Sequence, residues 1–165
     1  TVRRKYNTVI MNHYTQLLYY IKQLAEADQF VNTVTKGSFE DLDLNKKNIF
    51  NLLHINISGG SFTNGNTVIF DIQLGCFGIR DINKEIVNDK FWEQDNEVDN
   101  HNETLAVLNR LWLKMYTDFE KNNITSSENP TFEIQSFERH NLLDGWIMTF
   151  QVEMPNTIIN LCEPS

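Results

Sequence analysis

Residues 99–123, DNHNETLAVLNRLWLKMYTDFEKNN, carry the clearest secondary-structure signal in the chain. Large apolar side chains recur there at spacings of three and four, which places them on one stripe of an α-helix. Asp99 or Asn100 can cap the helix start, because a short side-chain oxygen accepts hydrogen bonds from the free N–H groups of a first turn. The stripe consists of Leu105, Leu108, Leu111, Trp112, Met115 and Phe119. We therefore predict a structural helix whose apolar side packs on a β-sheet.

A second amphipathic helix is predicted upstream, over residues 7–28. Its apolar residues again follow spacings of three and four, which is typical of a helix with one buried face. The polar face is not strongly basic, which argues against a helix that lies on a membrane surface. The predicted buried stripe is Ile10, Tyr14, Leu17, Ile21 and Leu24.

Five stretches have the pattern of β-strands. Alternation is strictest in residues 67–76 and 146–154, while residues 30–36 are rich in β-branched side chains. The other two candidates are residues 49–57 and 132–137, with residues 39–48 as a loop or an edge strand. The glycines and asparagines of residues 58–66 predict a hairpin turn. Because consecutive strands with short connections pair antiparallel, we predict an α+β fold of two layers: an antiparallel sheet of about four strands with both helices on one face.

The chain length of 165 residues predicts a single domain, 1–165, that buries roughly 70% of its unfolded surface. Three segments lie outside the regular pattern: a basic arm at 1–7, a long acidic loop at 78–98 and a C-terminal arm at 156–165. No apolar run reaches the length of a membrane span, and no signal peptide is predicted.

The formal net charge of −8 argues against a protein that binds nucleic acid tightly through its phosphates. The small basic arm contains Arg3, Arg4 and Lys5. Cys76 and Cys162 have neither metal-like nor redox-like spacing, so two free thiols in a reducing compartment are expected.

No constellation of catalytic, cofactor-binding or metal-binding residues is predicted. The four histidines, His13, His54, His101 and His140, are scattered, and none is expected to have a ligand-like partner four residues away on a helix. His54 falls on the outward face of its strand, and His101 lies at a helix start. The carboxylates of residues 81–99 lack the spacing of a calcium-binding loop.

Phe91 and Trp92 are an isolated aromatic pair in the acidic loop. Two interpretations remain open. The pair can tuck onto the domain's own core, or it can anchor on another subunit, because aromatic residues dominate the binding energy of interfaces.

The order of elements, with DNHNETLAVLNRLWLKM and the closing FERHNLLDGWIMTFQVEMPN followed by Cys162, resembles the tail-completion proteins of tailed bacteriophages. This means the terminator-type fold and the head–tail connector rings built on it in short-tailed phages such as the crAss-like group. The resemblance is one of pattern and spans most of the chain, from the first helix to Cys162.

The resemblance implies a virion structural protein with no catalytic task. Such a subunit would assemble with copies of itself into a cyclic ring, at the head–tail junction or in the tail, around the channel through which genomic DNA leaves the capsid. It would contact neighbouring portal, connector or tail proteins after assembly in the host cytoplasm. Arg3, Arg4, Lys5, Phe91 and Trp92 are the candidate interaction residues.

Two other hypotheses compete with a ring subunit. The first is a small α+β module of bacterial origin that binds a protein or a ligand. The second is an enzyme of unrecognised type, which substitution of His54 and His140 by alanine would test.

Overall fold

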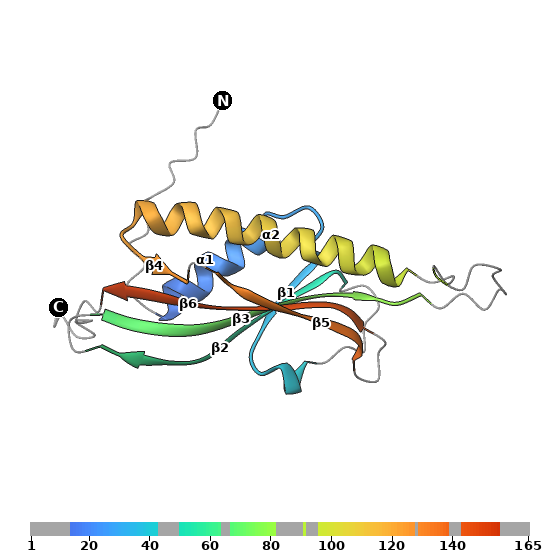
Figure 1. Cartoon of the computed structure of the whole chain (residues 1–165), viewed down its shortest axis with the longest axis horizontal. Coiled ribbons are helices and arrows are strands. Elements are labelled where there is room, and N and C mark those ends of the chain that lie inside the picture. The colour runs from blue at the N-terminus through green and yellow to red at the C-terminus, as the bar shows by residue number, and fades with distance from the viewer. Residues whose placement is uncertain are drawn as a thin grey trace, which may run out of the picture.

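Two helices lie on one side of a six-stranded sheet in the computed structural model (Figure 1). The structure describes residues 14–42, 50–63, 67–81, 91, 96–127, 129–138 and 143–155. The helices are α1 (Tyr14–Glu26) and α2 (Glu97–Lys121), and a short 3-10 helix, η1 (Phe39–Asp41), follows the first strand. The α+β class and the two-layer arrangement are as predicted.

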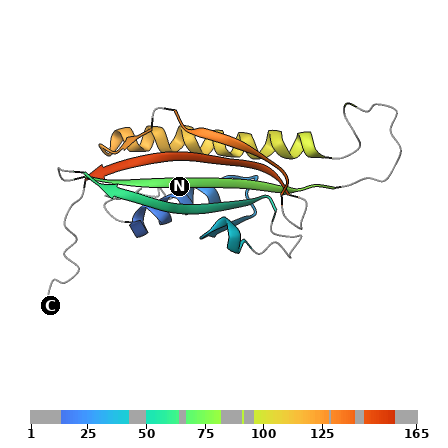
Figure 2. The same ribbon diagram turned by 60° about the horizontal axis from the view of Figure 1, so that its bottom comes forward.

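The sheet is mixed and larger than predicted. Its strands are β1 (Thr33–Lys36), β2 (Leu52–Phe62), β3 (Thr67–Ile79), β4 (Thr125–Ser126), β5 (Thr131–Glu138) and β6 (Leu143–Pro155). They are ordered β1-β2-β3-β6-β4, and β5 also pairs with β6. Figure 2 shows β2, β3 and β6 side by side along the length of the molecule, with α2 running beside them.

The expectation of a wholly antiparallel sheet is wrong at β1. This strand pairs with β2 in parallel, with Thr33 opposite Leu52 and Lys36 opposite Ile55. After β1 the chain leaves the sheet through η1 and comes back to the end at which β1 began, so both strands run in the same direction. A crossover of this kind has no signature in local alternation.

Strand β2 also extends beyond its prediction, through most of the segment expected to be a turn. A register shift between Ile57 and Gly59 marks a bulge, after which pairing with β3 continues to Phe62. A Cβ atom at Gly60 would lie 2.2 Å from the carbonyl oxygen of Ile69. Here glycine therefore permits close approach of two strands.

The main core lies between the helices and the sheet, as predicted. From the sheet, Ile72, Met148 and Phe150 are buried in it. The α2 stripe is rotated slightly from its predicted position, because Leu105 and Trp112 are only half-buried. The buried side chains of α1 and α2 are Leu17, Ile21, Ala25, Asn100, Thr104, Val107, Leu108, Leu111, Met115 and Phe119.

Polar side chains of α2 tie it to α1 and to the turn that follows α1. Arg110 donates two hydrogen bonds to Asp28, from Nε (2.7 Å) and Nη2 (2.9 Å). The Tyr20 hydroxyl donates to Asp118 at 2.8 Å. Burial, the hydrogen bond to Asp118 and its negative charge all raise the pKa of Tyr20. The polar side of α2 is therefore used within the chain.

The opposite face of the sheet is divided. At one end a small apolar cluster is built on Leu52, Phe77 and Leu143, with Phe39 of η1 packed against it. His54 faces away from the main core, as predicted, but it is only 2% exposed because it lies beside the ring of Phe39. The ring nitrogens of His54 lie 2.8 Å from Thr35 Oγ1 and 2.9 Å from the Gly37 carbonyl oxygen.

The irregular segments correspond only partly to their predictions. The predicted loop at 78–98 is shorter, because β3 continues to Ile79 and α2 begins at Glu97. The arms at 1–7 and 156–165 lie outside the described residues, as does the first part of the predicted helix at 7–28. No helix among the described residues combines the length and apolar character needed to cross a membrane.

Candidate functional site

A buried ion pair joins the end of β3 to the start of β6. Arg80 follows β3, and its Nε and Nη2 atoms donate to the two carboxylate oxygens of Asp144 at 2.8 and 2.6 Å. The two side chains are 2% and 0% exposed. A planar guanidinium and a carboxylate match in this two-bond geometry, which makes the pair directional as well as charged. Gly145 permits close approach of the backbones of β6 and β3, since a Cβ there would lie 1.9 Å from the Cys76 carbonyl oxygen.

The first turns of α2 complete a group that we call the Arg80 cluster: Arg80, Glu97, Asn100, His101 and Asp144. Glu97 Oε1 lies 2.8 Å from Arg80 Nη2 and 3.6 Å from His101 Nε2. Glu97 and His101 are four residues apart on the helix, so both side chains lie on the same side of it. With His101 neutral, the cluster carries one positive and two negative charges.

Asn100 and Trp146 fix the helix start against the sheet. Asn100 Nδ2 donates to the carbonyl oxygen of Ile79 at 2.9 Å. Trp146 Nε1 donates to the carbonyl oxygen of His101 at 3.0 Å, and the two rings meet edge to face. His101 Nε2 also lies 3.0 Å from Ser136 Oγ, which connects the cluster to β5.

The cluster has the residue types of a metal site but already contains a cation, Arg80. One ligand atom each from Glu97, His101 and Asp144 falls within 4.8 Å of the others. The Arg80 guanidinium, however, bridges the two carboxylates at hydrogen-bonding distance. A metal ion would have to displace a buried arginine, so we interpret the cluster as a structural network that positions α2.

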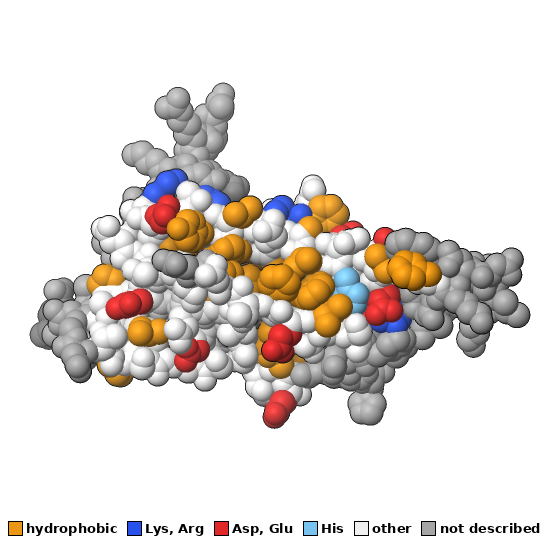
Figure 3. Space-filling view, in the orientation of Figure 1, with side chains coloured by type: hydrophobic (Ala, Val, Ile, Leu, Met, Phe, Trp, Pro, Cys, Tyr) orange, Lys and Arg blue, Asp and Glu red, His pale blue; other side chains and the backbone are white. Residues whose placement is uncertain are grey.

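An apolar groove of about 410 Å³ runs between α2 and β5. Figure 3 shows apolar side chains gathered along the middle of this side of the molecule. Phe132 and Ile134 of β5 are 53% and 55% exposed, although they point to the helix side of the sheet. The groove is lined by Asn102, Leu105, Ala106, Leu108, Asn109, Trp112, Pro130, Phe132 and Met148.

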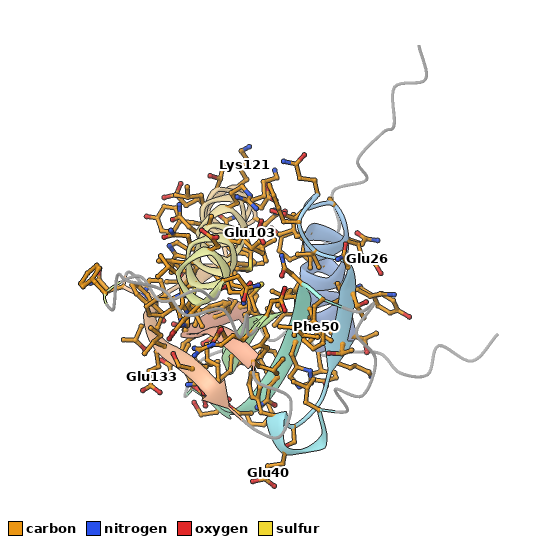
Figure 4. The ribbon with its side chains drawn as sticks, turned by 90° about the vertical axis from the view of Figure 1, so that its right-hand side faces the viewer. Glu26, Glu40, Phe50, Glu103, Lys121 and Glu133 are labelled. Carbon is orange, nitrogen blue, oxygen red and sulfur yellow. The ribbon has the colours of Figure 1, made fainter. Side chains whose placement is uncertain are left out.

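The helix-free face of the sheet is polar beyond its apolar cluster. Gln151 Nε2 donates to Asp71 at 2.7 Å, and Thr67 donates to Glu153 at 2.7 Å. Glu133 lies on the same face, opposite Ile147, and Figure 4 shows it on the side of the sheet away from Glu103 and Lys121. The described lysines and arginines lie elsewhere: Lys22 on α1, Lys36 on the helix side of β1, Arg80 in its buried pair, and Arg110, Lys114 and Lys121 on α2.

Of the five predicted interaction residues, the structure describes Phe91. Phe91 is 80% exposed, so among the described residues it does not tuck onto the core. Arg3, Arg4, Lys5 and Trp92 lie outside the described residues.

The sequence contained a signal for the Arg80 cluster that we missed. Glu97 and His101 have the four-residue helical spacing that we judged absent, because the helix was expected to begin at Asp99. The pairing of Arg80 with Asp144 had no such signal, since the two residues are far apart in the chain.

Comparison with protein-family models gives no match, and no curated protein is significantly similar to the chain in sequence.

Proposed function

We propose that the chain is a virion structural protein, a subunit of a homo-oligomeric ring at the head–tail connector or in the tail of a bacteriophage. In this proposal the ring forms part of the DNA exit channel and performs no catalysis. The observation that carries the proposal is the helix-free face, which presents Asp71, Glu133 and Glu153 and no described lysine or arginine.

The charge on this face suits a channel lining. Tight binding to DNA requires lysine and arginine contacts to phosphates. A wall of carboxylates, amides and hydroxyls repels phosphates weakly and leaves a passing duplex free to slide. The net charge of −8 acts in the same direction.

Electron microscopy of the purified protein and of the virions that contain it tests the proposal. We expect closed rings of this chain, alone or on the portal, with the helix-free face toward the lumen. Virions that lack the protein, together with a purified chain that stays monomeric with portal and tail proteins present, would refute it.

Charge reversal on the helix-free face tests the lining itself. The paired substitutions Asp71→Lys and Glu133→Lys should make assembled rings retain double-stranded DNA at a salt concentration at which wild-type rings release it. Glu26→Lys with Glu120→Lys, on the helices, is the matched control and should change retention little. Equal retention by both double variants would contradict the orientation.

The apolar groove favours one alternative, a small α+β module of bacterial origin that binds a protein or a ligand. Its volume of about 410 Å³ is within the usual range of ligand sites. Leu105→Asp would then abolish binding of a host partner by a monomeric protein, with no phage structural protein in the complex.

A further inference from the structure

The sheet ends in two edges that no strand among the described residues covers. One is the outer side of β5, which pairs only with β6. The other is the segment Asn56–Phe62 of β2, beyond the four residues that β1 covers. Strand edges of this kind present unpaired N–H and C=O groups that can pair with another chain.

Each edge also carries exposed apolar side chains on the helix side of the sheet. Phe62 is 79% exposed at one edge, and Phe132 and Ile134 are more than half exposed at the other. The apolar groove adjoins Phe132, and a second hollow of about 290 Å³ adjoins Phe62, Tyr14 and Phe70. Strand β5 has neither lysine nor proline, the residues that commonly protect an edge from pairing.

We propose that copies of this chain join head to tail through these edges. Strand β5 pairs antiparallel with Asn56–Phe62 of the neighbouring copy, with Phe132 opposite the neighbour's Phe62 and Ile134 opposite the neighbour's Gly60. The neighbour's Phe62 then covers the apolar groove. The inference rests on the proposed ring and supplies its subunit interface.

Strand direction agrees with this pairing. From β2 through β3 and β6 to β5 each strand runs opposite to the one before it. Strands β5 and β2 therefore run in opposite directions within one copy. In a head-to-tail arrangement the neighbour's β2 lies antiparallel to β5, and the two unlike edges can repeat around a closed ring.

The sides of the sheet to which the side chains point agree with this pairing as well. Phe132 lies opposite Met148 and Phe62 lies opposite Val68, both on the helix side. The same register places Glu133 opposite the neighbour's Ser61 on the helix-free side. Apolar side chains therefore meet on one face and polar side chains on the other.

The offset along the strands between the two edges of one copy fits a closed sheet. Phe132 is level with Leu74 of β3, whereas Phe62 is level with Val68, six residues along the same strand. Six residues span roughly 20 Å, and four strands are roughly 19 Å wide. Strands would thus incline by about 45° to the ring axis, close to the tilt at which sheets close.

Disulfide trapping tests the register on the full chain. The paired substitutions Ser61→Cys and Glu133→Cys, made with Cys162→Ser, place two thiols opposite each other across the proposed junction. Cys76 is fully buried and stays in place. After mild oxidation of assembled protein, we expect a ladder of covalent oligomers longer than dimers on a denaturing gel.

The matched control moves one thiol to Ser58, which is also exposed but lies three residues from Ser61. About 10 Å of strand then separates the thiols, too far for a disulfide. A ladder with Ser61 and none with Ser58 supports the proposal. Rings that form without a ladder, or a dimer from Glu133→Cys alone, overturn this interface and leave the ring function standing. Failure to assemble under any condition overturns both.

A second pair of variants tests the contact side chain. Phe62→Asp should lower the assembled fraction at least tenfold while circular dichroism stays unchanged. Tyr19→Asp is the control, because Tyr19 is 59% exposed on α1 and lines neither the apolar groove nor the second hollow. Equal assembly of Phe62→Asp and wild type would overturn the proposal.

Discussion

The protein makes the same two-bond arginine–aspartate pair twice, in very different surroundings. Arg80 and Asp144 are 2% and 0% exposed, whereas Arg110 and Asp28 are 44% and 7% exposed. The hydrogen-bond lengths are similar in the two pairs. The two pairs therefore differ in burial and not in bond geometry. The first joins β3 to β6 and holds the start of α2 through Glu97, and the second ties the turn after α1 to α2.

Removal of the buried arginine should have the largest effect. Arg80→Ala leaves the Asp144 carboxylate buried without its cation, which costs about 3–5 kcal/mol of folding free energy. Urea unfolding followed by circular dichroism measures the loss. A loss below about 1 kcal/mol would show that the cluster is not as closed to solvent as its exposure indicates.

Replacement of both partners sharpens the interpretation. Arg80→Met with Asp144→Leu removes both charges together and should recover most of the stability lost in Arg80→Ala, since buried ion pairs often exchange for apolar groups at little cost. If the double variant is no more stable than Arg80→Ala, the contacts that Glu97 and Asn100 make with the pair also require its charges.

Apolar packing along α2 should give the next largest effect. Leu108 is 1% exposed in the main core, so Leu108→Ala should cost about 2–5 kcal/mol through lost burial and an unfilled cavity. The control is Leu113→Ala on the same helix, where a side chain 58% exposed should cost less than about 0.5 kcal/mol. Thermal unfolding of both variants checks this. Equal melting temperatures would mean that α2 packs on the sheet through another face.

The sequence predicted the helices and long strands because their signals are local. Alternation in residues 67–76 and 146–154 located β3 and β6, and the stripe of α2 identified its buried side. Leu105 and Trp112 of that stripe line the apolar groove together with Phe132 of β5, where they stay half-buried.

The features that were missed depend on contacts between distant parts of the chain. The parallel β1, the burial of His54 under Phe39 and the Arg80–Asp144 pair all require tertiary structure. Glu97 and His101 are the exception, since a helix start placed two residues earlier would have brought them together. The candidate interface was equally hidden, because edge strands become recognisable only when strand order is known.

Removal of the exposed arginine should have a much smaller effect than removal of the buried one. Arg110→Ala breaks a pair whose cation is partly hydrated, and the expected cost is about 1 kcal/mol. Added salt should reduce the difference from wild type, because solvent-exposed charges are screened. Urea unfolding at low and high salt measures both quantities. A cost as large as that of Arg80→Ala would remove the distinction between the two pairs.

The smallest expected effect is a change in pH dependence at Asp28. Burial alone would raise the pKa of Asp28, but hydrogen bonds from Arg110 and the Phe30 N–H, with the Arg110 charge, lower it overall. The ionised form therefore stabilises the folded chain. This stability is complete above the pKa of an unfolded aspartate, about 3.9, and is lost as the pH falls through the lower folded pKa.

Asp28→Asn removes that titration. Between about pH 5 and pH 3, wild type should lose more stability than the variant, by a few tenths of a kcal/mol, since Arg110 is partly exposed. Unfolding curves at steps across this range give the two slopes. Identical slopes would mean that Asp28 titrates alike in the folded and unfolded chains, and that the surface pair contributes through its geometry and not its charge.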